Sequence, residues 1–501
     1  MSGNYSDLFS RASSQAKKIL KDGVLLETTE ALSLQVSNNY DFARRIVQEL
    51  ALIFAGQIIK HLNVGQKDRA YSHAGLYAPP GLGKDFAWKL VATSGIFPAD
   101  ALRMKKLENV TEAALSGTAN DNTIIPPPTV NEDIIFVGEY ATLMRGSNAQ
   151  PVSADMRAIL ESGEYSRRLA KIGQLKEAIM IHPDSNEAKY IKKQLEDYAK
   201  IGMTVDLDKS EISIKSTTSW VVASAKFGSE MTYGRSLLSM GDINRYRWRS
   251  YLPDRDERLK ITSEIGSLPP TTPNVAEKNA CREAWTLLIA GLRENPAEGL
   301  EVPRDEQSYY TRQRIWDDTQ KILMDTLGNK LEDVYFEQLV NLRTRAEFTR
   351  LMYQHATLKQ FERNQSHDFS QPYKFVINNV EDGEFAKQLW ISEYATSMID
   401  VMKDVLRQPG SNRSIRITLT AKGKTLVLEK LKEGPTKREE LIKIMNKNGI
   451  SPYLLDNEIL KALRKEEKIT RDSFGVYSLG TTGKQDQAML DSSMPETENP
   501  K

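Results

Sequence analysis

The string YAPPGLGKDF, residues 77–86, combines residue types that bind a phosphate chain. Ala78, Gly83 and Lys84 follow a pattern in which backbone amides surround phosphate oxygens and the lysine reaches the terminal phosphates. An apolar run precedes the loop and the helix-forming FAWKLV follows it, which is the context that this chemistry needs. The alternative is a surface turn, because Pro-Pro-Gly forms turns without a ligand. We expect the nucleotide to contact Ala78, Pro79, Pro80, Gly81, Leu82, Gly83, Lys84 and Asp85.

Both positions expected to hold a magnesium ion carry unusual residues. The residue after Lys84 is commonly Ser or Thr, which binds the ion, but in this chain it is Asp85. A second apolar run, IIFV, ends at Gly138 and Glu139, where many ATPases have Asp and Glu. We therefore expect Glu139 to polarise the attacking water, and Asp85 to bind the metal in compensation for Gly138. Decay of hydrolysis, or repulsion of the phosphates by Asp85, is the alternative.

The composition shows no dominant charge. The 501 residues include 68 Lys and Arg and 67 Asp and Glu, so nucleic-acid binding has to come from local patches. The single cysteine, Cys281, excludes an internal disulfide and a cysteine-based zinc site. No apolar run approaches the roughly 20 residues of a membrane span, and the N-terminus does not resemble a signal peptide. We expect a cytoplasmic, DNA-associated protein without membrane contact.

The order of apolar runs predicts an α/β protein of several domains. From 66 to 262, short apolar runs alternate with helical or loop segments, which indicates a core with a buried parallel sheet. An insertion with its own charged helix interrupts this core at about 174–210. The other predicted parts are N-terminal helices at 1–65, a helical region at 263–405, a linker at 406–435, a compact domain at 436–480 and a disordered tail at 481–501.

Residues 436–480 predict a helix, a turn, a second helix and a hairpin, the pattern of a winged helix. Thr436 and Glu439 have the spacing of a capping box at the start of the first helix. Acidic residues nearby leave protein binding as the alternative to DNA binding. The basic residues expected to contact DNA are Lys461, Arg464, Lys465 and Arg471.

Together these segments resemble the AAA+ ATPases, and most closely the ATPase module of the minichromosome maintenance (MCM) replicative helicases. The similarity covers about residues 70–400 and includes ENVTEAALSGTA between the phosphate motifs and DMRAILESGEYSRRLAKIG before a hairpin. It implies an α/β AAA+ P-loop NTPase core with a helical lid, N-terminal helices and a C-terminal winged-helix domain. It also implies ATP and Mg²⁺ as cofactors, and a homo-oligomeric, hexameric ring that translocates on or unwinds DNA. We expect no counterpart of the oligonucleotide-binding N-terminal domain of those helicases in residues 1–65.

The resemblance assigns further residues to the nucleotide. TTSWVVASAKFG resembles the first-sensor strand, which places Lys226 near the γ-phosphate, with Ser224 as the alternative. LRTRAEFTRLMYQHATLKQF resembles the second-sensor helix of the lid, with Arg343 as the sensor and Arg345 as the alternative. Without the resemblance, the two arginines would be charges at the start of an exposed helix.

The segment LLSMGDINRYRWRSYLPDRDERLKI resembles the arginine-finger region. Arg245, which precedes an aromatic residue, would then offer its charge to the γ-phosphate of the neighbouring subunit. Aligning LLSMGD with the corresponding Leu-Leu-Ser-Arg-Phe-Asp of the helicases would instead place Met240 at the finger position. A further alternative makes Arg245, Arg247 and Arg249 alternate residues on one solvated strand face.

The hairpin of this family faces DNA in the central channel, and Lys171 occupies the place of its lysine. Arg167 and Arg168 on the same arm and Lys215 on the other would grip phosphates without reading sequence. The alternative is a solvated strand.

Two other functions stay open. A nucleotide-switched DNA-binding initiator or scaffold with little hydrolysis would account for Lys226 and for the changed metal positions. A protein-remodelling AAA+ machine of the MoxR type would use the winged helix to recruit a protein.

Overall fold

The computed structural model describes two compact units, residues 1–323 with 338–409 and residues 324–337 with 410–501. The residues that it describes are 5–36, 41–60, 69–79, 82, 84–99, 101–107, 110, 115, 117–120, 123–138, 149–169, 172–225, 244–267, 274–293, 306–328, 333–364, 375–407, 413–448, 450 and 452–480.

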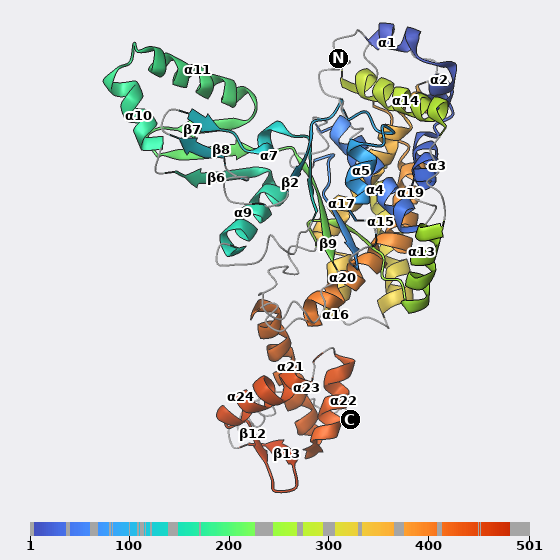
Figure 1. The fold of residues 1–501 in the computed structure, drawn as a ribbon. Helices are drawn as coiled ribbons and strands as arrows, with labels where there is room; N and C mark the ends of the chain where they lie inside the picture. Colours follow the sequence, from blue (N-terminus) through green and yellow to red (C-terminus); the bar gives the residue numbers. More distant parts are fainter. Residues whose placement is uncertain are drawn as a thin grey trace. The chain divides into compact units, whose positions relative to one another are not determined.

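In the described part of the first unit, parallel strands form a five-stranded central sheet in the order β10–β1–β9–β5–β2 (Figure 1). These strands are β1 (Ala74–Ala78), β2 (Met104–Leu107), β5 (Ile134–Val137), β9 (Ser219–Ala225) and β10 (Arg247–Ser250). β1 and β5 are buried along their whole length, as expected for strands with both faces covered. The prediction of an α/β core with a buried parallel sheet is confirmed.

The strand order creates a switch point between β1 and β9. From β1 the chain runs to β2 at one edge of the sheet and returns through β5 to β9. From β9 it passes over β1 to β10 at the other edge. The connections that leave β1 and β9 therefore run in opposite directions, and open α/β sheets bind ligands outside the carboxyl ends of the strands at such a point. Residues 79–85 follow β1 at this position.

The N-terminal helices belong to the first unit. They are α1 (Tyr5–Arg11), α2 (Ser14–Lys21), α3 (Leu25–Val36) and α4 (Asp41–Ile58). In α4, 14 of 18 residues are buried, because its apolar residues lie around almost the whole helix. It packs between the sheet strand β10 and the helix α17, so the predicted helical region at 1–65 forms part of the core around the sheet.

The remaining described helices of this unit include most of the region predicted as a lid. α17 contacts α4, and α20 packs against β10. No helix of the described residues combines the length and the apolar character needed to cross a bilayer. The bounds are α5 (Phe86–Ala92), α7 (Pro128–Asn131), α9 (Ala149–Ser162), α13 (Arg255–Ser267), α14 (Val275–Arg293), α15 (Glu306–Leu323), α17 (Leu342–Leu358), α18 (Gln360–Arg363), α19 (Asn379–Leu389), η3 (Trp390–Tyr394) and α20 (Ala395–Arg407), with a short hairpin of β3 (Thr118–Asn120) and β4 (Thr123–Ile125).

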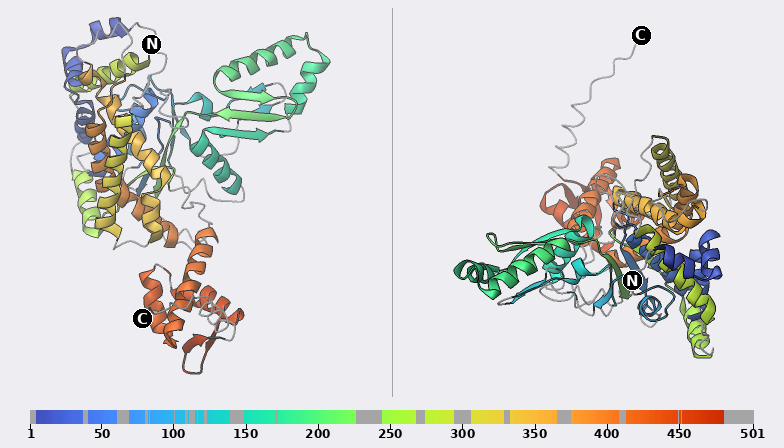
Figure 2. Two further views of the ribbon diagram at one scale, coloured as in Figure 1. Left: turned by 180° about the vertical axis from the view of Figure 1, so that it is seen from behind. Right: turned by 90° about the horizontal axis from the view of Figure 1, so that it is seen from above.

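A second, antiparallel sheet includes one strand of the predicted insertion. Its described strands have the order β6–β8–β7, with β6 (Glu164–Arg168), β7 (Met203–Asp206) and β8 (Glu211–Lys215). α10 (Ile172–Ile181) and α11 (Asn186–Lys200) lie along one side of these strands (Figures 1 and 2). The expected hairpin arms thus pair as β6 and β8, and the insertion adds a further strand and two helices instead of one charged helix.

The second unit contains a helix–helix–hairpin arrangement within 436–480, drawn in orange and red in Figure 1. Its three described strands pair in the order β11–β13–β12. The elements are η2 (Met324–Gly328), α16 (Asp333–Leu339), which extends into the first unit, α21 (Arg413–Glu433), β11 (Thr436–Lys437), α22 (Arg438–Lys447), α23 (Pro452–Leu454), η4 (Leu455–Ile459), α24 (Leu460–Lys465), β12 (Ile469–Arg471) and β13 (Val476–Leu479).

The structure adds a helix to one predicted segment of this region and contradicts another prediction. The linker predicted at 406–435 contains helix α21, which buries Val427 and Leu431 because residues four apart share one helix face. The predicted capping box does not form, since Thr436 lies in β11 and its hydroxyl donates to the Gly434 carbonyl at 3.0 Å. Helix α22 begins one residue later than expected, at Arg438, with Lys437 at the N-cap position.

Candidate nucleotide site

Lys84 lies buried at the carboxyl end of β1, with 8% of its surface exposed. Its ammonium donates to the carbonyl oxygens of Ala78 at 2.9 Å and Pro79 at 3.1 Å. Lys84, two residues before α5 begins at Phe86, is thus bonded back to the end of the strand from which the loop starts. An ammonium held at the switch point of the sheet is well placed for the phosphates of a nucleotide.

The two positions predicted to hold magnesium lie side by side. The Oδ1 atom of Asp85 is 3.4 Å from the point where a Cβ on Gly138 would lie. Lys106 of β2 reaches the same place: its Nζ is 3.8 Å from Asp85 Oδ1 and 3.8 Å from that Cβ position. Sequence reasoning missed Lys106. The signal available was MKKL, a strand-like run between the two phosphate motifs, but its neighbour in the sheet depends on the strand order.

The described side chains at this place do not fit a magnesium ion held by carboxylates. Mg²⁺ requires nearly octahedral oxygen ligands and usually takes one or two carboxylates together with phosphate oxygens. Gly138 supplies no ligand, and Asp85 already pairs with the Lys106 ammonium. Near a protein surface, like unit charges 4 Å apart repel by about 4 kcal/mol, so a metal ion and Lys106 would compete for Asp85. Among the described residues, no cluster of three or more His, Cys, Asp or Glu side chains is suited to a metal.

Of the residues predicted for the first sensor, Ser224 is described and buried. It lies in β9 opposite Tyr77 of β1, one residue before the end of both strands. It is thus close to the edge of the sheet from which the phosphate loop starts. The predicted residues Pro80, Gly81, Gly83, Glu139, Lys171, Lys226 and Met240 lie outside the described residues, as does the predicted tail at 481–501.

Arg245 and Arg343, the predicted finger and second sensor, meet at Glu161 of α9. Arg245 Nη2 donates to Glu161 Oε2 at 2.7 Å, and Arg343 donates to the other carboxylate oxygen. Burial raises the pKa of Glu161, but the bonds to the two arginines outweigh it and hold the pKa below its ordinary value. Arg345, the alternative sensor, instead donates to Gln313.

This arginine pair lies at the amino edge of the central sheet. Arg247, the first residue of β10, pairs with Ala74, the first residue of β1. Arg245 comes two residues earlier, whereas Lys84 lies beyond the far end of β1. Five strand residues span about 13 Å, so Arg245 is at least that far from the phosphate loop of its own chain. Arg245 and Lys84 of one chain therefore lie toward opposite ends of the sheet strands.

The alternative that placed Arg247 and Arg249 on a solvated strand face was wrong for these two residues. Their side chains are 1% and 0% exposed. Glu49 of α4 binds both guanidinium groups, and Gln354 of α17 and Tyr394 of η3 accept further bonds from them. Alternating arginines on an edge strand looked like a solvated face because the helices that carry these partners are distant in sequence.

The predicted DNA contacts of the hairpin lie on a sheet of balanced charge. Arg168 stands opposite Glu211, and Lys215 stands opposite Glu164, 3.6 Å from its carboxylate. Both cations are exposed, whereas Arg167 points to the opposite, half-buried side of β6 because side chains alternate along a strand. The exposed face of this sheet therefore presents no excess of positive charge at these pairs.

In the second unit, the predicted DNA contacts are exposed. Lys461, Arg464 and Lys465 lie along α24, and Arg471 lies on β12 with its guanidinium 5.6 Å from the ring centre of Tyr477. Phe474, at the tip of the hairpin, is 89% exposed. These exposed cations are the candidates for a local positive patch in a chain whose overall charge is balanced.

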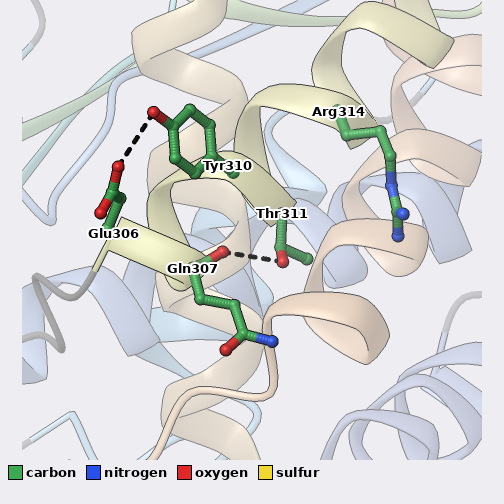
Figure 3. Close-up of a pocket in the computed structure, with 5 residues that line it drawn as sticks. All are labelled: Glu306, Gln307, Tyr310, Thr311 and Arg314. Atoms are coloured by element: carbon green, nitrogen blue, oxygen red, sulfur yellow. Dashed lines mark hydrogen bonds between the residues drawn. The ribbon is translucent and has the colours of Figure 1, made fainter.

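Figure 3 shows a hollow in the first unit. It has a volume of about 540 Å³, and the residues that line it are Glu306, Gln307, Tyr310, Thr311 and Arg314. All of them belong to α15, and the bonds between them, Tyr310 to Glu306 and Thr311 to the Gln307 carbonyl, join successive turns of that helix (Figure 3). This hollow contains no part of the phosphate loop and does not mark the nucleotide site.

Neither the models of known protein families nor the curated proteins with which the sequence was compared give a match.

Proposed function

We propose that the chain is an MCM-like AAA+ ATPase that binds ATP at residues 78–85 and uses it to act on DNA. One observation carries the proposal: the Oδ1 atom of Asp85 is 3.4 Å from the point where a Cβ on Gly138 would lie, and these two residues are interpreted as the two sides of one phosphate–metal site. Two motifs that are far apart in the sequence thus meet beside a buried lysine at the switch point of the sheet.

In this proposal the phosphates of ATP lie between two subunits. Lys84 binds the β- and γ-phosphates, and Glu139 orients the attacking water. Arg245 and Arg343 come from the neighbouring copy in a ring. Their position at the amino edge of the sheet, opposite the loop, supports a contribution across an interface, and their meeting at one carboxylate supports a shared anionic partner.

We propose that the ATP-driven motion of the chain acts on DNA. Support comes from the exposed cations of α24 and β12 in a unit whose helices and hairpin have the order of a winged helix. The cations on β6 and β8 give weaker support because acids stand opposite them. Phosphate contacts of this kind hold DNA without reading its sequence.

A nucleotide-switched DNA-binding protein is the second candidate. The position of Lys106 favours it, because an ammonium at the expected metal position neutralises charge but does not lower the pKa of a bound water as a metal ion does. Such a protein would bind ATP and hydrolyse it slowly.

Lys84→Ala tests the proposed site. We expect the affinity for a fluorescent ATP analogue to fall about tenfold or more, since a charge-assisted contact contributes roughly 1.5–3 kcal/mol. Lys89→Ala, on the exposed side of α5, is the matched control and should bind as the wild type does. Equal affinity of wild type and Lys84→Ala would contradict the proposal. ATP turnover with and without single-stranded DNA then separates the candidates: stimulation supports the motor, binding without turnover the switch, and turnover indifferent to DNA a protein remodeller.

A further inference from the structure

We propose that the ammonium of Lys106 takes the place of the magnesium ion, so that this chain binds ATP without a divalent cation. The inference rests on the proposed nucleotide site and names a binding residue that the motifs did not include.

The side chain of Lys106 occupies the space beside Gly138 that a larger side chain at position 138 would need. β2 and β5 are neighbours in the sheet, with Lys106 opposite Phe136, so the lysine side chain can extend past the end of β5. Its Cε is 3.4 Å from the point where a Cβ on Gly138 would lie. A carboxylate side chain at position 138 would therefore have to share this space with the lysine stem. The Asp that many ATPases have at the place of Gly138 is therefore absent where the Lys106 side chain lies.

Asp85 orients the replacement cation. Its Oδ1 is 3.8 Å from Lys106 Nζ, and the lysine side chain is 30% exposed, whereas that of Asp85 is 71% exposed. An ammonium has three donor hydrogens, so it can serve a carboxylate and a phosphate oxygen together. The Asp that replaces Ser or Thr after Lys84 thus has a partner other than a metal ion.

The charges around the loop agree with this assignment. Lys84 at the end of β1 and Lys106 from β2 provide two cations for the phosphates, and Asp85 provides one anion. Without Lys106, Asp85 would face the phosphates as a like charge, which costs several kcal/mol at about 4 Å and intermediate dielectric. A divalent ion would add charge where the lysine has already supplied it.

The experiment measures the binding of a fluorescent ATP analogue to the full chain in excess Mg²⁺ and in EDTA. We expect the two affinities of the wild type to agree within about threefold. A wild-type affinity at least tenfold lower in EDTA overturns the inference but leaves the proposed function in place. No binding in either buffer overturns the proposed function itself. This arm needs no substitution and so does not depend on the folding of a variant.

Lys106→Met, which retains the apolar stem and removes the charge, sharpens the test. We expect its affinity in EDTA to fall about tenfold or more, and Mg²⁺ to restore part of it because Asp85 is then released. Lys106→Arg retains a cation and should bind in EDTA within a few-fold of wild type. Lys105→Met, at the exposed neighbouring position of β2, is the matched control and should behave as the wild type does. Equal affinities of Lys106→Met and wild type in EDTA would refute the role of Lys106.

Discussion

Two groups of charged side chains in the first unit differ in what surrounds them. Arg247 and Arg249 of β10 are buried, and Glu49 binds both, with Arg247 Nη2 at 2.8 Å and Arg249 Nε at 3.1 Å. At the phosphate loop, the side chain of Asp85 is 71% exposed, and its distance to the Lys106 ammonium is 3.8 Å. The first group is enclosed by protein, and the second faces solvent.

Neutral groups complete the buried cluster. Gln354 of α17 accepts from Arg247 at 2.6 Å, and Tyr394 accepts from Arg249 at 3.1 Å, with its ring centre 4.2 Å from the same guanidinium. Burial raises the pKa of the Tyr394 hydroxyl, which donates to Glu49. These bonds join α4, α17 and η3 to the edge strand β10. A buried ion that is bonded in this way holds helices together and is not available to a ligand.

The comparison teaches that burial and partners, more than residue type, separate structural from ligand-binding cations. Arg247 and Arg249 stand beside the predicted finger in sequence, yet they hold the core. Lys106 belongs to no motif, yet it lies at the candidate site. Substitutions in the buried cluster should therefore lower the free energy of unfolding, whereas substitutions at the phosphate loop should mainly change nucleotide binding.

The largest effect is expected from Glu49→Gln. The change leaves two buried guanidinium groups without their shared carboxylate, and breaking a buried ion pair costs about 3–5 kcal/mol of the free energy of unfolding. Urea denaturation followed by circular dichroism measures it. Glu27→Gln, on the exposed side of α3, is the control with little expected change. A loss below about 1 kcal/mol for Glu49→Gln would show that the cluster does not hold the core.

An intermediate effect is expected from Glu161→Gln, which removes the carboxylate shared by Arg245 and Arg343. Its side chain is 49% exposed, so solvent screening limits the loss to about 1 kcal/mol or less. Because the folded state has the lower pKa, the carboxylate contributes fully above the ordinary pKa of 4.5 and progressively less as the pH falls through the lowered value. The difference in unfolding free energy between wild type and variant should thus shrink below about pH 4.5. A difference that grows on acidification would contradict the pairing.

The smallest effect on stability is expected from Asp85→Ser. The side chain is mostly exposed and forms one long ion pair, so the free energy of unfolding should change by about 0.5 kcal/mol or less. Urea denaturation of the Asp85→Ser and Glu49→Gln variants in one series measures the free energy of unfolding of each. A loss approaching that of Glu49→Gln would mean that Asp85 stabilises the fold and would weaken its assignment to the ligand site.

Much of the fold was predictable because its signals are local. Apolar runs bounded by polar residues gave the strands β1, β5 and β9, and Gly83 with Lys84 indicated the loop between strand and helix. The meeting of residues 85 and 138 could also be expected, since the carboxyl ends of parallel strands lie at one edge of a sheet. Helix α21 was missed because its buried face packs on elements that follow it in the chain.

By itself, the sequence determined the alternation of strands and helices and the residue types of the phosphate loop, because backbone preferences and side-chain periodicity depend on neighbours along the chain. The tertiary structure alone decided that Lys106 lies beside Asp85 and that Glu49 forms ion pairs with Arg247 and Arg249. Those contacts depend on which strands are adjacent and on which distant helix covers an edge. An ion pair between such elements leaves no spacing in the sequence from which it could be inferred.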